Sequence, residues 1–346
     1  MKLITTQADL SHALRAIAPA VGTGNSHPIL SCCLIAADAG VMTVTGFNLE
    51  LGITVSVPAA IDTPGTVALP YRLLAGLVGR MDDGEPVTLS DGAVSASSAS
   101  YGLAVQDAAD YPAMPVVEAP SAELDLTAGA RACMIAASTD SSKQILQGIH
   151  MAAGFMEATD GHRMMRVPVP LPDGIDLILP ASTMKLLQDR TVTVAATTGQ
   201  AVINAGDGIT IYSRLLDGKF PNVAALVPTS FEHAMTLDRH RFARCLERVA
   251  LIAEAHNSVV KLTAGAGGLA ITAEADANNG KELITYDGTA AGAWAFNVHY
   301  LLDGLKAMRQ AETVTLSANS ATTPVVLRPT SMTEQTYLIM PIQIRE

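Results

Sequence analysis

The chain has 346 residues, which is enough for two or three domains of about 100–150 residues each. Hydrophobic residues make up 49% of it and aromatic residues only 4%, which argues against a protein that stacks carbohydrates or builds an aromatic cage. The net charge of −11 argues against nucleic-acid binding by the molecule as a whole, because phosphate groups attract Lys and Arg.

The cysteines and the apolar runs set further limits. Cys32, Cys33, Cys133 and Cys245 form no C-x-x-C pair, so we expect buried, reduced thiols in a cytoplasmic protein, with neither a metal site nor a cofactor. The first residues, MKLITTQADL, lack the apolar run of a signal peptide. No run reaches the roughly 18 apolar residues of a membrane span.

The first repeated pattern is a helix followed by an apolar strand and a β-hairpin. Amphipathic helices are predicted at residues 8–22, 129–141 and 238–254. The segments that follow them alternate apolar and polar residues and are interrupted by Gly, Asn and Asp, which is typical of β-hairpins. These segments are residues 29–57, 145–170 and 259–287.

The second pattern follows each copy of the first. It is a short apolar strand, a helix-start residue, an amphipathic helix and a strand of the V-T-L type, at residues 67–90, 177–197 and 294–317. The helix-start residues are Pro70, Pro180 and Asn297, which are 110 and 117 residues apart. Such self-similarity predicts three copies of one structural unit.

Each copy should be an α+β domain with two helices packed on antiparallel sheets. The boundaries are expected in two proline-bearing stretches, MPVVEAPSAE at 114–123 and ALVPTSFEH at 225–233. The predicted domains are therefore residues 1–118, 119–228 and 229–346.

Charge is distributed unevenly between the predicted helices and the rest of the chain. The helical segments carry twelve basic and five acidic residues, a net charge of +7, which leaves −18 for the remainder. Lys and Arg are good helix formers and could simply occupy solvated faces, but Glu is as good a helix former and supplies only one of the five acids. The pattern favours a functional basic surface on the helices.

Motifs for catalysis are missing. The sequence contains no P-loop, H-E-x-x-H or G-x-S-x-G motif, and GAGGLA at 265–270 is better explained as a hairpin turn than as a nucleotide loop. In EATDGHRMM at 157–165, Asp160 and Gly161 predict a hairpin turn with His162 and Arg163 after it. A hydrolase that uses Asp160 and His162 is a second hypothesis, and a repetitive β-rich scaffold is a third. The apolar terminal stretch TYLIMPIQIRE should be a docked strand and could line a groove.

Seven short segments together resemble the bacterial DNA polymerase III beta subunit, the sliding clamp family. They are HPIL (27–30), GFNLE (46–50), ILQG (145–148), TDGHRM (159–164), LDGKFP (216–221), FNVHYLLDGL (296–305) and YLIMPI (337–342), in the family's order along nearly the whole chain. The resemblance implies a DNA-tethering protein, a processivity factor rather than an enzyme. Two subunits would form a head-to-tail dimeric ring whose helices line a basic hole for duplex DNA, with acidic sheets outside.

The resemblance also implies partners and sites. The polymerase III catalytic subunit, other polymerases, the clamp loader and repair proteins would insert a motif with Leu and Phe anchors into a groove between the second and third domains, in the cytoplasm at the nucleoid. The groove would be lined by Leu146, Thr159, Gly161, His162, Arg163, Met164, Pro221, Leu226, Leu338, Met340, Pro341 and Ile342. The DNA-facing basic residues would be Arg15, Arg72, Arg80, Arg131, Lys185, Arg190, Arg239, Arg241, Arg244, Lys306 and Arg309. The subunit joint would pair Tyr101 and Leu103 with Leu251 and Ile252, although ordinary core positions explain these four equally well.

The chain departs from the family pattern at three places. Ala225 stands where the family often has an Arg near the groove, and Gly24 or Asn25 replaces a basic residue of the early loop. The ending MPIQIRE is longer and more acidic than the common one. These departures imply that a polar contact in the groove is missing and that one expected DNA contact is weaker.

Overall fold

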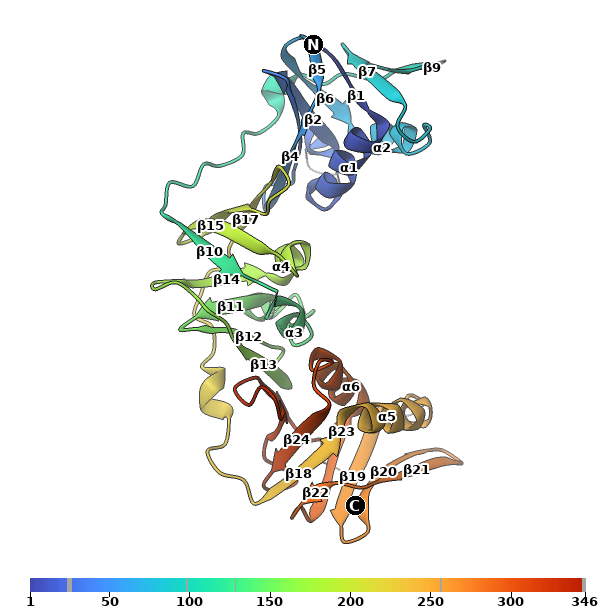
Figure 1. The fold of residues 1–346 in the computed structure, drawn as a ribbon, viewed down its shortest axis with the longest axis vertical. Coiled ribbons are helices and arrows are strands. Elements are labelled where there is room, and N and C mark those ends of the chain that lie inside the picture. Colours follow the sequence, from blue (N-terminus) through green and yellow to red (C-terminus); the bar gives the residue numbers. More distant parts are fainter. Residues whose placement is uncertain (24–26, 98, 128, 256, 344–346) are drawn as a thin grey trace. The chain divides into compact units, whose positions relative to one another are not determined.

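The computed structural model describes the chain except for residues 24–26, 98, 128, 256 and 344–346 (Figure 1). It separates into two compact units, which we describe separately. Unit 1 comprises Met1–Leu124 and Thr191–Leu215, and unit 2 comprises Asp125–Arg190 and Leu216–Glu346. In the described part of the chain, none of the helices combines the length and the apolar character needed to cross a membrane.

The elements follow one order three times. The first copy contains β1 (Lys2–Thr6), α1 (Gln7–Ile17), β2 (Cys32–Asp38), β3 (Val41–Phe47), β4 (Leu51–Pro58), β5 (Ala60–Thr63), β6 (Gly65–Pro70), α2 (Tyr71–Val78), β7 (Pro86–Ser90), β8 (Ala93–Ala96) and β9 (Ala99–Gly102). The second contains β10 (Ser121–Asp125), α3 (Ala130–Met134), β11 (Gly148–Ala152), β12 (Phe155–Thr159), β13 (Arg163–Pro168), β14 (Asp176–Pro180), α4 (Ala181–Leu187), β15 (Thr191–Thr197), β16 (Gln200–Asn204) and β17 (Ile209–Arg214). The third contains β18 (His233–Asp238), α5 (Arg239–Ala253), β19 (Val259–Gly265), β20 (Gly268–Ala275), β21 (Asn278–Ile284), β22 (Asp287–Gly288), β23 (Gly292–Asn297), α6 (Val298–Ala307), β24 (Thr313–Ala318), β25 (Val325–Pro329) and β26 (Thr336–Ile339). Short 3-10 helices lie at Ala18–Ala20, Pro28–Ser31, Ala108–Asp110, Gln144–Gln147 and Val223–Leu226.

The sheets show the repeat most clearly. Each copy supplies two antiparallel four-stranded groups, which we call half-sheets. One kind has the order β6-β2-β3-β4, β14-β11-β12-β13 or β23-β19-β20-β21, and the other kind β1-β7-β8-β9, β10-β15-β16-β17 or β18-β24-β25-β26. The prediction of an α+β chain with three repeated units of two helices on antiparallel sheets is confirmed.

Half-sheets of neighbouring copies fuse edge to edge. In unit 1, β4 pairs with β17, and Gly52 lies opposite Tyr212 in this pair. In unit 2, β13 pairs with β26, and Met164 lies opposite Leu338. Residues Thr336–Ile339 of the apolar terminal stretch are therefore docked as a strand in the nine-stranded sheet of unit 2, as the composition predicts.

Helices α1, α5 and α6 begin at residues whose side chains cap them. Asp238 accepts a hydrogen bond from the backbone N–H of Arg241 at the start of α5, and Thr6 and Asn297 cap α1 and α6 in the same way. Helix α5 buries apolar residues along one stripe, namely Phe242, Cys245, Leu246, Val249, Ala250 and Ala253. In unit 2, Figure 1 shows α3, α4 and α6 on the same face of the nine-stranded sheet.

The helix predicted at 129–141 is wrong in its length, because α3 ends at Met134. Polar side chains beyond it make turns of their own. The Ser138 hydroxyl accepts a hydrogen bond from the Asp140 N–H, and the Asp140 carboxylate accepts one from the Ser142 N–H. Such local bonds compete with the helix for backbone groups.

Candidate partner and nucleic-acid interfaces

The ionisable residues Asp160, His162 and Arg163 lie at the turn between β12 and β13. Asp160 Oδ1 accepts hydrogen bonds from the backbone N–H groups of His162 (2.8 Å) and Arg163 (3.0 Å), and Gly161 adopts a φ of +94°. These are the bonds of a hairpin turn, so the hairpin prediction is confirmed. The Asp160 carboxylate contacts the His162 backbone in these bonds, which disfavours its use with the imidazole as an acid–base pair.

A buried apolar cluster joins β13 and β26, and we call it the joint cluster. It consists of Met164, Ile178, Phe220, Val223, Val326 and Leu338. Leu146 packs against it as a partly buried residue. The structure therefore brings together Leu146, Met164 and Leu338 from three separate segments, as the predicted groove requires.

The other predicted groove residues differ in their exposure. Leu226, Met340 and Ile342 are 56%, 38% and 37% exposed, respectively. The Met340 N–H donates to the His162 carbonyl at 2.9 Å, which holds the end of β26 against the turn. Gly161, His162 and Pro221 are exposed, Pro341 is half-buried, and Thr159 is buried with its hydroxyl bonded to the Arg163 carbonyl.

Arg163 points to the other side of the sheet. Its guanidinium bonds to Asp160 (3.0 Å) and to Asp303 of α6 (2.5 Å), and it stacks over the Tyr300 ring at 4.3 Å. Successive strand residues face opposite sides, and Met164 occupies the cluster side. Burial lowers the pKa of Arg163, but Tyr337 and Asp303 raise it by more, so the group stays charged. Arg163 thus ties α6 to β13 and is separate from the apolar surface.

The basic residues of the helices are mostly exposed. Arg15, Arg72, Arg80, Arg131, Lys185, Arg241, Arg244, Lys306 and Arg309 are exposed, and Arg190 is half-buried. Arg80, Arg190 and Arg309 lie just beyond the ends of their helices. Arg131 is partly neutralised by an ion pair with Asp189.

Arg239 differs from this set. Its side chain is buried, with 6% of the residue exposed, and its Nε donates to the Ala311 carbonyl at 2.8 Å. The expectation that its guanidinium faces DNA is therefore wrong, because the group satisfies a backbone oxygen inside unit 2. A residue at the first position of a helix can face inward, and the sequence alone carried no signal for this.

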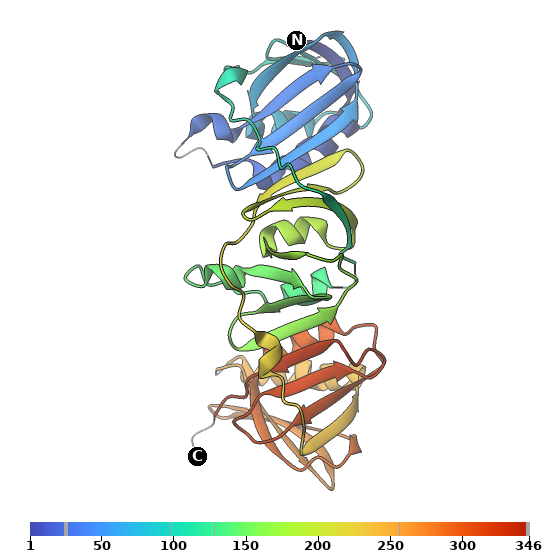
Figure 2. The same ribbon diagram turned by 90° about the vertical axis from the view of Figure 1, so that its left-hand side faces the viewer.

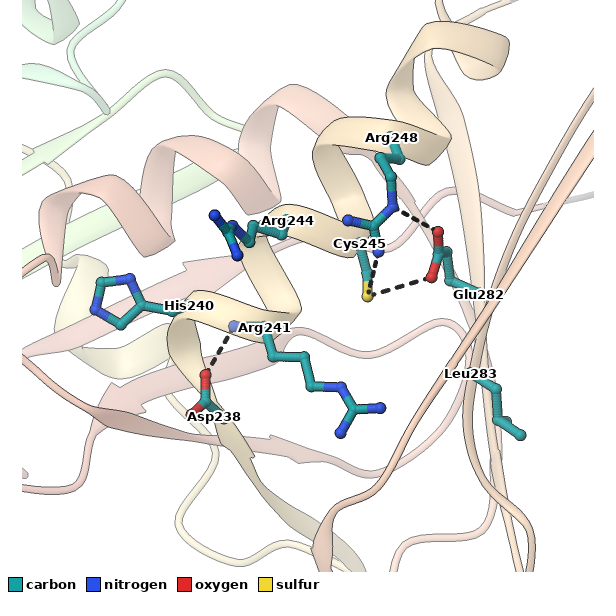
Figure 3. Close-up of a pocket in the computed structure, with 8 residues that line it drawn as sticks. All are labelled: Asp238, His240, Arg241, Arg244, Cys245, Arg248, Glu282 and Leu283. Atoms are coloured by element: carbon teal, nitrogen blue, oxygen red, sulfur yellow. Dashed lines mark hydrogen bonds and ion pairs between the residues drawn. The ribbon is translucent and has the colours of Figure 1, made fainter.

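A basic cavity of about 610 Å³ lies between α5 and β21 (Figure 3). It is lined by Asp238, His240, Arg241, Arg244, Cys245, Arg248, Glu282 and Leu283. Arg248 Nε bonds to Glu282 at 2.7 Å, which lowers the pKa of that carboxyl. Figure 3 shows Arg241 extending toward the β21 side, while Arg244 and His240 project from the other side of the helix.

Two strand edges lie beside exposed apolar residues. Among the described residues, β9 and β21 each end a sheet, with a hydrogen-bonded neighbour on one side only. Tyr101 in β9 is 41% exposed, Leu251 on α5 is 75% exposed, and Ile252 is half-buried. Leu103 is only 8% exposed, so it belongs mainly to the interior of unit 1.

Two exposed apolar residues were not predicted from the sequence. Leu73 is 51% exposed and lies third after the N-cap of α2, the position that Tyr300 takes in α6. Leu283 of β21 is 54% exposed. An alignment of α2 with α6 at Pro70 and Asn297 places Leu73 at the position of Tyr300, and this would have identified Leu73. Of the departures, Ala225 is exposed in the 3-10 helix at Val223–Leu226, whereas Gly24 and Asn25 lie outside the described residues.

The four cysteines are free and buried, as expected. Burial raises the pKa of the Cys33 thiol to about 12. In the part of the chain that the structure describes, no three His, Cys, Asp or Glu side chains gather as metal ligands would.

Comparison with known proteins places the chain in a family. The models of the N-terminal, central and C-terminal domains of the DNA polymerase III beta subunit match residues 1–115, 125–222 and 224–343. A beta sliding clamp of Synechococcus elongatus is 34% identical over 100% of both chains, and one of Synechocystis is 32% identical over 99% of this chain and 100% of its own. The crystal structure of a Bacillus subtilis DNA polymerase sliding clamp has the same fold, with a TM-score of 0.91, 22% identity and 100% coverage of both chains. The chain therefore belongs to the DNA polymerase III beta subunit family, the beta sliding clamps.

Proposed function

We propose that two copies of this chain close head to tail into a ring around duplex DNA, and that the ring tethers the replicative polymerase as a processivity factor. The observation that carries this proposal is the pattern of fused half-sheets. Two of the three joints that the repeat allows are formed within the chain, β4 with β17 and β13 with β26. The third joint would use β21 and β9. In the repeat, β21 corresponds to β4 and β13, and β9 corresponds to β17 and β26.

A second copy would complete the same arrangement. If β21 of one copy pairs with β9 of the other, every half-sheet has a partner, and the head-to-tail contact closes because it occurs twice. Unpaired strand edges invite such pairing. Tyr101 and Leu251 are exposed beside these edges and support this joint, and the exposure of Leu73 and Leu283 adds to it.

The charge of the helices suits an inner surface that faces DNA. Within the described helices, the acidic residues are Asp9, Glu247 and Asp303, against nine basic ones. We assign DNA contact to the exposed basic residues named above, without Arg239. Attraction to phosphates is independent of sequence, so a ring held by it can move along the duplex.

The surface around the joint cluster would take the partner peptides. Leu226, Met340 and Ile342 offer exposed apolar contacts, and Met and Leu adapt to more than one ligand. Polymerases, the clamp loader and repair proteins are the proposed partners, and no catalytic role is assigned to any residue. We propose domains at residues 1–118, 119–228 and 229–346. The ring would lie on the DNA of the nucleoid.

Retention on DNA tests the proposed ring. The protein is loaded by its clamp loader onto nicked circular DNA, free protein is removed, and the circle is then cut once. The ring should stay on the circle and leave the linear molecule through its ends. A linear molecule with both ends blocked by bound streptavidin is the control, and it should retain the ring.

Other results would contradict the proposal. Equal retention on circular and open linear DNA would mean ordinary DNA binding. Failure to be retained on the circle at any salt concentration, with an active loader present, would favour the scaffold hypothesis.

A further inference from the structure

His150 makes three contacts on the sheet face that also carries the joint cluster. It lies in β11, and its Nδ1 is 2.9 Å from Glu157 Oε1 in β12, while its Nε2 is 3.0 Å from Asp176 Oδ1 in β14. An ionised carboxylate only accepts hydrogen bonds, so both ring nitrogens donate to these partners when the ring is an imidazolium. Bonds at both nitrogens restrict the orientation of the ring.

Phe220 packs on the ring that these bonds hold. The two ring centroids are 4.8 Å apart with an angle of 23° between the planes, which is a stacked arrangement. Phe220 is 6% exposed and belongs to the joint cluster. The orientation of His150 therefore defines where the Phe220 ring can lie.

Phe220 lies in the segment that presents part of the proposed peptide surface. Figure 2 shows residues 216–227, in yellow, crossing the sheet of unit 2 as an extended strip with a short helix. The segment is held at its start by a bond from the Leu216 N–H to the Ile178 carbonyl (3.0 Å) and farther along by Val223 in the cluster. Between these two points, Phe220 stacks on His150 and packs in the joint cluster. Pro221 and Leu226, on the same segment, are exposed.

We propose that His150 is a positioning residue for partner binding. The two carboxylates hold its ring, the ring holds Phe220, and Phe220 keeps residues 221–226 where the partner's apolar anchors meet them. This inference rests on the proposed peptide surface. If the side chain at position 150 only filled space, an apolar residue would do so without removing two carboxylates from water.

Two substitutions separate the contribution of the ring from that of its hydrogen bonds. His150→Ala removes the stack and both hydrogen bonds, whereas His150→Phe keeps a ring to stack on. Glu157 retains Arg166 as an ion-pair partner at 3.1 Å, and the Asp176 side chain is 79% exposed, so neither carboxylate is stranded in His150→Phe. His233→Ala is the matched control, since His233 contacts the Trp294 ring elsewhere in unit 2.

The measurement is the affinity for a dye-labelled decapeptide with adjacent Leu and Phe anchors, read by fluorescence anisotropy. His150→Ala should weaken binding about three- to tenfold, and His150→Phe should stay within about twofold of the natural protein. His233→Ala should have no effect. Hydrogen exchange without peptide should become faster in residues 217–226 of His150→Ala and stay unchanged in β11 and β12. Retention on circular DNA should not change.

The outcomes distinguish a failure of this inference from a failure of the proposed peptide surface. If the natural protein does not bind the peptide, the proposed peptide surface is wrong. If it binds and Leu226→Asp weakens binding, but His150→Ala binds normally, only the role of His150 is overturned. A His150→Phe protein as weak as His150→Ala would overturn the role of the stack.

Discussion

At the scale of single residues, the site depends on which side of a strand each side chain takes. Met164 and Arg163 are neighbours in β13, yet Met164 enters the joint cluster and Arg163 bonds to α6. The sequence predicted that both lie at the groove, because a motif gives the residues and not the register of the strand. Arg239 shows the same limit, since its burial follows from a bond to Ala311, which is 72 residues away in the chain.

Arg163 should matter for stability more than for peptide contact. Arg163→Met leaves Asp160 and Asp303 without this partner and removes the stack on Tyr300. Because the side chain is only 12% exposed, we expect a loss of about 2–4 kcal/mol from the free energy of unfolding of unit 2. Urea unfolding measures this, with the exposed Arg309→Met as the control. A change below about 0.5 kcal/mol, as at an ordinary surface site, would contradict the tie between α6 and β13.

The charge of His150 predicts a pH dependence. Burial lowers its pKa, but the bonds to Glu157 and Asp176 raise it by more, so the pKa lies above the ordinary 6.5. The stabilisation is therefore complete below about pH 6.5, where the unfolded imidazole is also protonated, and disappears as the pH rises through the folded pKa. The difference in melting temperature between the natural protein and His150→Phe should shrink between pH 6 and pH 9. A difference that grows with pH would contradict the charged ring. Arg166 also pairs with Glu157, at 3.1 Å.

At the scale of elements, the sequence predicted the repeat but not the joints. Helix starts at Pro70, Pro180 and Asn297 and the hairpins follow from local periodicity and turn residues, and they appear where expected. The end of α3 was missed because Ser138 and Asp140 close turns that periodicity does not register. The fusion of β4 with β17 and of β13 with β26 depends on pairing between distant segments, which a local pattern cannot specify.

The open edges predict a dimer that one substitution disrupts. Leu251 is 75% exposed on α5, so Leu251→Asp should fold normally but place a charge in the proposed joint. Sedimentation equilibrium should give the natural protein twice the 36.0 kDa of one chain, and Leu251→Asp a single chain.

Leu226→Asp is the matched control for this measurement. Leu226 is 56% exposed in the same unit but lies on the proposed peptide surface, so its substitution should leave the dimer intact. If both variants remained dimers, α5 would have no part in the joint.

At the scale of the whole molecule, the net charge argues against DNA binding, whereas the distribution of charge favours it. The chain carries −11, yet its helices are basic, and a ring would turn this contrast into a basic inside and an acidic outside. The sheets give the reason for proposing two copies. One chain has three repeats and two internal joints, and a second chain would offer a partner to the edges of β9 and β21.

Electron microscopy of single particles in solution tests the proposed ring most directly. At a resolution that traces strands, it should show two chains around a central opening, with β9 of each chain antiparallel to β21 of the other and the helices facing inward. A single chain, or two chains joined through strands other than β9 and β21, would contradict the proposed ring.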